Sequence, residues 1–239
     1  MPIFRLEDDE LSFPPAYLAE EPGIIAVGGD LSPDRLIQAY AGGIFPWFHP
    51  GDEPLWWSPN PRCVIFPAKI KISKSMRQVL RKGQFTVTFD QNFEGVIDNC
   101  QKIYREDQQG ETWISEELKA SYMELHRRGF VHSVEVWQDE ELVGGLYGGY
   151  MGKCFFGESM FAKASNASKV GFIMLAKNLE EKGFELIDCQ VHTPHLESLG
   201  AEMIPRADFL KTIEENYHTE FIKEDWNEFF RTDFFDKKQ

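Results

Sequence analysis

The pattern of apolar and polar positions predicts β-strands in the middle of the chain, where aromatic and aliphatic residues are frequent. Three such runs follow one another with only short turns between them: VHSVEVW at residues 131–137, ELVGGLYGGY at 141–150 and KCFFGESMF at 153–161. Because turns this short join neighbouring strands, the runs predict an antiparallel meander. A helix is expected from Lys169 to Lys182, closed by Gly183, and one more strand is expected at Phe184–Val191.

Serine caps and glycine stops predict the other helices. Ser32 as N-cap, with Pro33 in the first turn, opens a helix through about Tyr40. The remaining expected elements are a short basic helix near residues 73–82, a strand at 85–89, a helix at about 92–104, and a helix that Ser115 caps and Gly129 stops.

Composition divides the chain and limits its class. Proline and glycine are frequent through Pro67, so we expect a small loop-rich N-terminal domain over residues 1–66 and a larger domain over residues 67–239. Beyond Tyr217 acids mix with aromatic residues, and a terminal helix docked on the core is expected. No run of 18 apolar residues occurs, and the acidic start does not have the form of a secretory signal. The 4 cysteines show no paired spacing, which favours reduced thiols in a cytoplasmic protein.

The charge is unevenly distributed. A net charge of −14 argues against nucleic acid as a partner, because a polyanion is repelled by such a field. Residues 60–82, however, hold basic residues and no acid, namely Arg62, Lys69, Lys71, Lys74, Arg77, Arg81 and Lys82. Such a run is either a solvated helix surface or a local phosphate-binding face, and we favour phosphate binding.

Two polar residues stand on the last predicted strand. Alternation places the side chains of Asp188 and Gln190 on one face and those of Ile187 and Cys189 on the other. A buried polar pair is costly unless it is hydrogen-bonded, so the pair is either satisfied structure or a site. The nearby Cys189, His192 and His195 could suggest a metal or a thiol nucleophile, but the strand separates Cys189 from His192 and a fourth ligand is not evident. We therefore expect no metal.

Several motifs in order along residues 12–210 resemble one family. They are GGDLSPDRLIQAYAGGIFPWF at 28–48, WWSPNPR at 56–62, TWI at 112–114, HSVEVW at 132–137, LVGGLYGG at 142–149, GESMF at 157–161, NASK at 166–169 and DCQVHTPHLESLGA at 188–201. The set closely resembles the bacterial leucyl/phenylalanyl-tRNA–protein transferases, and ordered blocks are far more specific than one short motif.

The resemblance implies a fold and an activity. The fold is α+β or α/β, an acetyltransferase-like (GNAT-type) mixed sheet with flanking helices and a small N-terminal domain. The order of meander, helix and final strand agrees with it. The activity is transfer of Leu or Phe, and less well Met, from aminoacyl-tRNA to the N-terminal Arg or Lys of acceptor proteins, which marks them for N-degron proteolysis. A monomeric cytoplasmic enzyme is implied. The loop FAKASNASK has no glycine with which to cradle a pyrophosphate, so neither acetyl-CoA nor another cofactor is expected.

The resemblance also implies residue roles. Gln190 contacts the attacking amine, and we expect it to orient that amine while Asp188 holds Gln190 and stabilises developing positive charge. Trp57 and Trp113, more than Trp56, are expected to stack on the terminal adenosine, although tryptophans are often core fillers. Glu158, beside Ser159, is expected either at the acceptor's basic residue or at the donor amino group, with Glu135 and Glu197 as alternatives. The donor side-chain pocket, which could equally be ordinary core, is expected to comprise Leu146, Phe155, Met160, Phe172, Leu179 and Ile187.

Two other functions stay open. A tRNA-binding or adaptor protein could keep the fold without chemistry, although the Asp188/Gln190 pair and GESMF argue against it. An acetyl-CoA-dependent N-acyltransferase could use the same fold.

Overall fold

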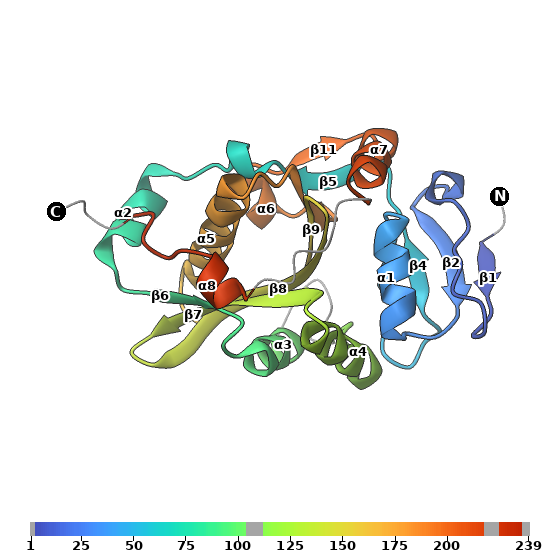
Figure 1. Ribbon diagram of the computed structural model, residues 1–239, viewed down its shortest axis with the longest axis horizontal. Helices are drawn as coiled ribbons and strands as arrows, with labels where there is room; N and C mark the ends of the chain where they lie inside the picture. The colour runs from blue at the N-terminus through green and yellow to red at the C-terminus, as the bar shows by residue number, and fades with distance from the viewer. Residues whose placement is uncertain (1–2, 104–111, 218–224, 236–239) are drawn as a thin grey trace.

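The computed structural model describes residues 3–103, 112–217 and 225–235, and its strands form two sheets (Figure 1). The small N-terminal sheet has the order β1-β2-β4-β3, with strands β1 (Phe4–Leu6), β2 (Ile24–Gly28), β4 (Leu55–Trp57) and β3 (Phe45–Pro46). Strand β1 runs parallel to β2, and the other pairs are antiparallel. The short helix η1 (Ala16–Leu18) and helix α1 (Pro33–Ala41) complete this unit.

The second sheet has seven strands and carries most of the chain. Its order is β11-β5-β10-β9-β8-β7-β6, formed by β11 (Glu202–Ile204), β5 (Arg62–Ile65), β10 (Leu186–Gln190), β9 (Cys154–Ala162), β8 (Glu141–Met151), β7 (Val131–Gln138) and β6 (Thr86–Phe89). Strands β7, β8 and β9 form the expected antiparallel meander. Strand β10 returns parallel to β9, so the sheet is mixed.

Helices cover both faces of this sheet (Figure 1). On one face lie α3 (Phe93–Lys102) and α4 (Glu116–Arg127), and on the other lie α5 (Ala167–Glu181) and the terminal α8 (Trp226–Phe229). The remaining helices are η2 (Pro67–Lys69), α2 (Lys74–Lys82), α6 (Pro194–Leu199) and α7 (Arg206–Tyr217). Two apolar clusters result, one on each face, because alternate strand residues point to opposite sides.

The caps predicted at Ser32 and Ser115 are present, and Ser73 caps α2 in the same way. The side chains of Ser32, Ser73 and Ser115 each accept a backbone N–H in the first turn of the helix that follows. These hydrogen bonds satisfy donors that have no partner inside the helix, which explains why the helices begin where the sequence predicts.

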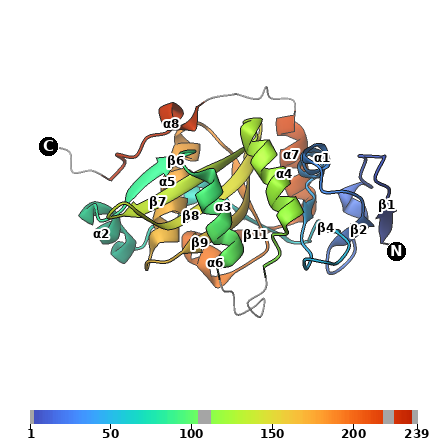
Figure 2. The same ribbon diagram turned by 90° about the horizontal axis from the view of Figure 1, so that it is seen from below.

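The small unit packs on the large one through α1. Both views place α1 beside α4 and α7, and the N- and C-termini lie at opposite ends of the molecule (Figure 2). Contact at α1 brings Tyr40, which is fully buried, against the large sheet. The N-terminal unit therefore contributes directly to the interior of the larger one.

The expected class, a mixed sheet with flanking helices and a small N-terminal part, is confirmed. The division at residue 66 stays a prediction, and β5 at residues 62–65 already belongs to the larger sheet. Tail residue Trp226 is buried against Phe89 and Phe230, whereas residues 218–224 of the predicted tail lie outside the described part. Among the helices described, none is long and apolar enough to cross a bilayer.

Candidate active site

A pocket of about 590 Å³ opens where β8, β9 and β10 meet α5 and α6. Eight of the predicted site residues line it: Trp113, Leu146, Glu158, Ser159, Met160, Phe172, Asp188 and Gln190. Most of its wall is apolar, and the buried polar groups gather at the end of β10. This combination of an apolar wall with a few convergent polar groups is typical of ligand sites.

Asp188 is buried and paired with a cation. Its carboxylate accepts hydrogen bonds from Arg62 Nε at 2.8 Å and from Arg62 Nη2 at 2.6 Å. The rings of Phe45 and Phe209 lie 4.7 and 4.5 Å from the guanidinium carbon and hold it between them. A bidentate pair of this kind is among the stronger charge-assisted contacts.

The pairing corrects one prediction. Arg62 was assigned to the phosphate-binding run, but its side chain is 1 % exposed and is turned into the core. It lies on β5, next to β10, so it faces Asp188 from the neighbouring strand. The other six basic residues, Lys69, Lys71, Lys74, Arg77, Arg81 and Lys82, are exposed.

Gln190 does not continue the strand alternation. Its φ is +62°, in the left-handed region, and the register with β5 shifts between Asp188 and Gln190. The backbone N–H of Gln190 donates to Asp188 Oδ1 at 2.9 Å, and its side-chain amide donates to Glu158 Oε1 at 3.1 Å. Asp188 therefore holds Gln190 through its backbone N–H, whereas the side-chain amide of Gln190 is held by Glu158.

Glu158 receives three hydrogen bonds from three elements. Tyr40 Oη on α1 donates to Oε1 at 2.9 Å, Tyr122 Oη on α4 donates to Oε2 at 2.6 Å, and Gln190 supplies the third. Burial raises the pKa of Glu158 to about 7, and the charge of Asp188 adds to that rise, while the three donors oppose it. Burial, followed by the charge of Glu158, raises the pKa of both tyrosines, which therefore stay neutral donors.

These residues, namely Glu158, Gln190, Asp188, Arg62, Tyr40 and Tyr122, are called the pocket cluster below.

The tryptophans divide into core and pocket. Trp113 lines the pocket as predicted, and Trp47, which the sequence analysis did not select, lines it too and is 37 % exposed. Trp57 does not line the pocket but donates its Nε1 to the Trp47 carbonyl at 2.6 Å, with ring centroids 5.6 Å apart. Trp56 is fully buried. Trp47 stands in the same GGDLSPDRLIQAYAGGIFPWF block that carries the resemblance, which was the available signal.

The apolar wall is smaller than expected. Leu146, Met160 and Phe172 line the pocket, whereas Phe155, Leu179 and Ile187 are buried in the core behind it. Phe155 packs in the same apolar cluster as Leu146 and Phe172, but it is buried and does not reach the pocket. These three residues therefore do not form pocket wall in this structure.

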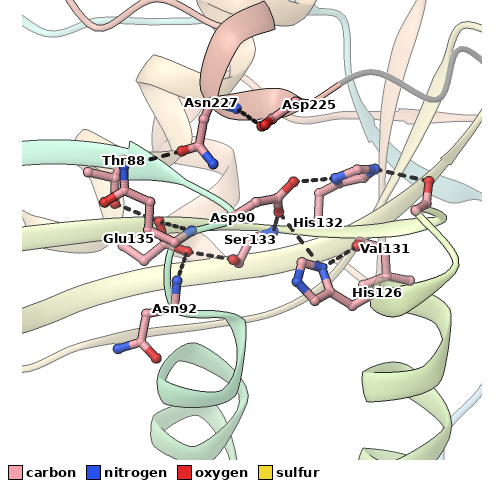
Figure 3. Close-up of polar contacts among 12 residues, drawn as sticks. Thr88, Asp90, Asn92, His126, Val131, His132, Ser133, Glu135, Asp225 and Asn227 are labelled. Carbon is pink, nitrogen blue, oxygen red and sulfur yellow. Dashed lines mark hydrogen bonds and ion pairs between the residues drawn. The ribbon is translucent and has the colours of Figure 1, made fainter.

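A second polar cluster, largely buried, lies where the end of β6 and strand β7 meet the last turns of α4 (Figure 3). Asp90 bonds His132 Nδ1 at 2.6 Å and lies 3.9 Å from His126 Nδ1, and its Oδ1 accepts the backbone N–H of Ser133. Glu135 accepts hydrogen bonds from the hydroxyls of Ser133 and Thr88 and from the backbone N–H groups of Asn92 and Gln91.

The residues just described, Asp90, His126, His132, Ser133 and Glu135, are called the closed cluster. None of them lines the large pocket. Glu135 therefore loses its place as an alternative acid at the site. Glu197, the other alternative, is exposed and lies 3.3 Å from His192.

The cysteine and histidines after β10 do not assemble a metal site. Across the described ranges, no group of three His, Cys, Asp or Glu side chains is placed to hold an ion. His192 and His195 do line the pocket, and burial followed by the charge of Lys169 lowers the pKa of His195.

The protein thus has a mixed α/β fold and a largely apolar pocket with a few buried polar groups at one edge. Comparison of its sequence with known proteins identifies the family. A family model described as "Leucyl/phenylalanyl-tRNA protein transferase" matches residues 64–214, and the model of that family's N-terminal domain matches residues 29–60. A leucyl/phenylalanyl-tRNA–protein transferase of Syntrophus aciditrophicus is 54 % identical over 95 % of this chain and 94 % of its own length. One from Christiangramia forsetii is 57 % identical over 84 % of this chain and 95 % of its own.

The chain therefore belongs to the leucyl/phenylalanyl-tRNA–protein transferase family and is a transferase enzyme. Among solved structures, a GCN5-related N-acetyltransferase from Kribbella flavida is similar with a TM-score of 0.36 and 10 % identity, over 71 % of this chain and 60 % of that one. The structural similarity to that acetyltransferase is too weak to indicate a function.

Proposed function

We propose that the protein transfers leucine or phenylalanine, and less well methionine, from aminoacyl-tRNA to the N-terminal Arg or Lys of acceptor proteins, within the pocket on β9 and β10. Transfer from tRNA to protein accords with the family to which the chain belongs. The location rests on one observation, that Gln190 is held from both sides at the edge of an apolar pocket.

The donor fits the apolar part of the pocket. Leu146, Met160 and Phe172 offer a wall without charge, and the flexible methionine suits both branched and aromatic side chains. Such a wall distinguishes one methylene by only about 1–3 kcal/mol, which is why methionine is also accepted. Trp113 and Trp47 are the aromatic surfaces at the pocket on which the terminal adenine stacks, at about 1–3 kcal/mol per base.

The acceptor approaches a negative site. Glu158 is the acid in the pocket that no cation neutralises among the described residues, so it attracts a positively charged N-terminal residue. Gln190 orients the attacking amine and Asp188 fixes Gln190 by accepting its backbone N–H. Correct positioning of the two reactants contributes on the order of 7–11 kcal/mol in such reactions, so a strong base is not required.

The exposed basic residues of η2, of α2 and of the segment between them contact tRNA phosphates in this proposal. Six cations lie close together in the sequence on a chain of net charge −14, so they offer phosphates a local attraction that the whole molecule does not. We also propose a monomer that acts in the cytoplasm, in keeping with its free and buried cysteines, and whose products enter N-degron proteolysis.

The test is transfer of labelled leucine from charged tRNA to a protein that begins with Arg, with the same protein beginning with Gly as control. We expect transfer only to the first, and a loss of at least about 100-fold in kcat/KM for Gln190→Ala with unchanged thermal unfolding. Equal transfer to both acceptors would contradict the acceptor class. Salt-sensitive tRNA binding without transfer would support the adaptor function, and acetyl transfer would support a different donor.

A further inference from the structure

The two carboxylates at the pocket have different electrostatic surroundings. Asp188 is neutralised by the bidentate contact with Arg62. Glu158 is surrounded instead by neutral donors, the hydroxyls of Tyr40 and Tyr122 and the amide of Gln190, and no basic side chain of the described residues pairs with it. One buried acid thus has a cation as its partner, whereas the other has only neutral donors.

We infer that Glu158 is the proton carrier of the transfer reaction, accepting a proton from the acceptor amine and delivering it to the departing ribose oxygen. The inference deepens the proposed function, since it depends on transfer taking place in this pocket. Gln190 remains the residue that orients the amine, and Glu158 is the residue that moves its proton.

The geometry leaves one position of the carboxylate available. An ionised carboxylate offers about four acceptor positions, and three of those on Glu158 are taken by Tyr40, Tyr122 and Gln190. Tyr40 and Gln190 both donate to Oε1, so the open position is on Oε2, which accepts from Tyr122 alone. An amine that Gln190 orients is brought to the carboxylate that holds the Gln190 amide. An amide such as Gln190 is itself a very weak base, and both carboxylate oxygens of Asp188 accept hydrogen bonds from Arg62.

The surroundings suit proton exchange near neutral pH. The ionisable groups around Glu158 are Tyr40 on α1, Tyr122 on α4, Tyr147 on β8 and Asp188 on β10, with Arg62 on β5 behind Asp188. Burial is the largest cause of the rise in the pKa of Glu158, which reaches about 7. A carrier is most effective when its pKa lies near the working pH, because it then takes up and releases the proton equally well.

The proton balance closes without a cofactor. The neutral amine nitrogen forms a bond to the ester carbonyl carbon, and the bond from that carbon to the 3′ oxygen of the ribose breaks, its electron pair going to oxygen. The nitrogen loses one proton to Glu158, and the 3′ oxygen gains one proton from Glu158. The carboxylate is thereby regenerated for the next turnover.

The decisive experiment is the pH profile of kcat/KM for leucine transfer, measured for the parent and for Glu158→Gln. In the parent, both the acceptor amine and Glu158 must lose a proton, so log kcat/KM should rise with a slope approaching about 2 at low pH; in Glu158→Gln the slope should be about 1. The rate should also fall by about 100-fold or more. Glu135→Gln, a buried acid of the closed cluster, is the matched control and should keep the parent profile.

A second donor separates proton transfer from binding. If Glu158 only held the donor's α-amino group, Glu158→Gln would lose its effect with a tRNA that carries the α-hydroxy analogue of phenylalanine. We expect the loss of rate to persist with that donor. The inference would be overturned if the loss of rate disappeared with that donor, or if the slope of the pH profile were unchanged in Glu158→Gln. It would also be overturned if the slope fell to about 1 in His195→Gln instead of in Glu158→Gln.

Two further results keep the outcomes distinct. Tyr122→Phe removes one donor from Glu158 and should shift the acid limb of the profile towards higher pH, even if Glu158→Gln fails to fold. If pocket variants such as Gln190→Ala leave transfer unchanged, the location in the proposed function is wrong. If they abolish transfer while Glu158→Gln keeps both rate and slope, only the proton-carrier role is wrong.

Discussion

The pocket cluster and the closed cluster are both buried groups of acids on the same sheet, yet their surroundings differ. In the closed cluster, Glu135 accepts four hydrogen bonds and Asp90 pairs with His132, and none of these residues lines the pocket (Figure 3). In the pocket cluster, Glu158 faces a cavity of about 590 Å³ and has only neutral donors. Both clusters contain buried acids, so burial alone does not distinguish them. What distinguishes a candidate functional acid from one that only stabilises the fold is contact with a cavity and the lack of a neutralising cation.

Asp188 combines features of the two clusters. It lines the pocket, as Glu158 does, but it is paired with the cation Arg62. Arg62→Met should have the largest effect, because it leaves Asp188 as a buried charge without a partner. We expect a loss of about 3–5 kcal/mol in the free energy of unfolding, measured by urea denaturation. The double variant Arg62→Met/Asp188→Asn should recover most of that loss, and a cost below about 1 kcal/mol for the single variant would show that the pair is not stabilised as described.

Glu158 predicts a pH dependence of stability. Its pKa in the folded protein, about 7, lies above the ordinary value of 4.5, so the folded state binds this proton more tightly than the unfolded state. The contribution is fully present below pH 4.5 and is lost as the pH rises through about 7. The free energy of unfolding of the parent, relative to Glu158→Gln, should therefore fall by at most about 3 kcal/mol over that range, and parallel curves for the two proteins would contradict the burial argument.

Glu135→Gln probes the closed cluster. Its amide group would turn donors towards the hydroxyls and N–H groups that now donate to the carboxylate, and some would lose their partner. We expect a loss of about 1–3 kcal/mol in unfolding free energy, measured by thermal denaturation, with kcat/KM within about 3-fold of the parent. A large loss of activity at unchanged stability would place Glu135 in the active site after all.

The smallest effect is expected outside both clusters. Replacing Arg77, Arg81 and Lys82 by Gln should weaken tRNA binding several-fold at moderate salt and lower the salt dependence by about one charge for each lost phosphate contact. Titration of labelled tRNA at several salt concentrations measures both. Lys211→Gln, an exposed cation on α7, is the control, and equal effects of the two changes would indicate a general rather than a local attraction.

Much of the fold could be predicted because it depends on local rules. The predicted caps Ser32 and Ser115 start their helices, and the three strand-like runs joined by short turns form the meander in the expected order. Eight of the predicted site residues line the pocket, and all of them but Phe172 stand in the ordered motifs. The predictions that were wrong concern direction in space: Arg62 points inward to Asp188, and Phe155, Leu179 and Ile187 lie behind the pocket.

The sequence by itself determined the elements, the mixed α/β class and the family, because capping, alternation and ordered motifs are properties of neighbouring residues. Only the tertiary structure decided the connections of the site. The left-handed turn at Gln190 directs its amide to Glu158, and the docking of α1 brings Tyr40 to the same carboxylate from 118 residues away. The physical reason is that the charge state of a buried acid depends on partners from distant segments, and packing alone brings those partners together.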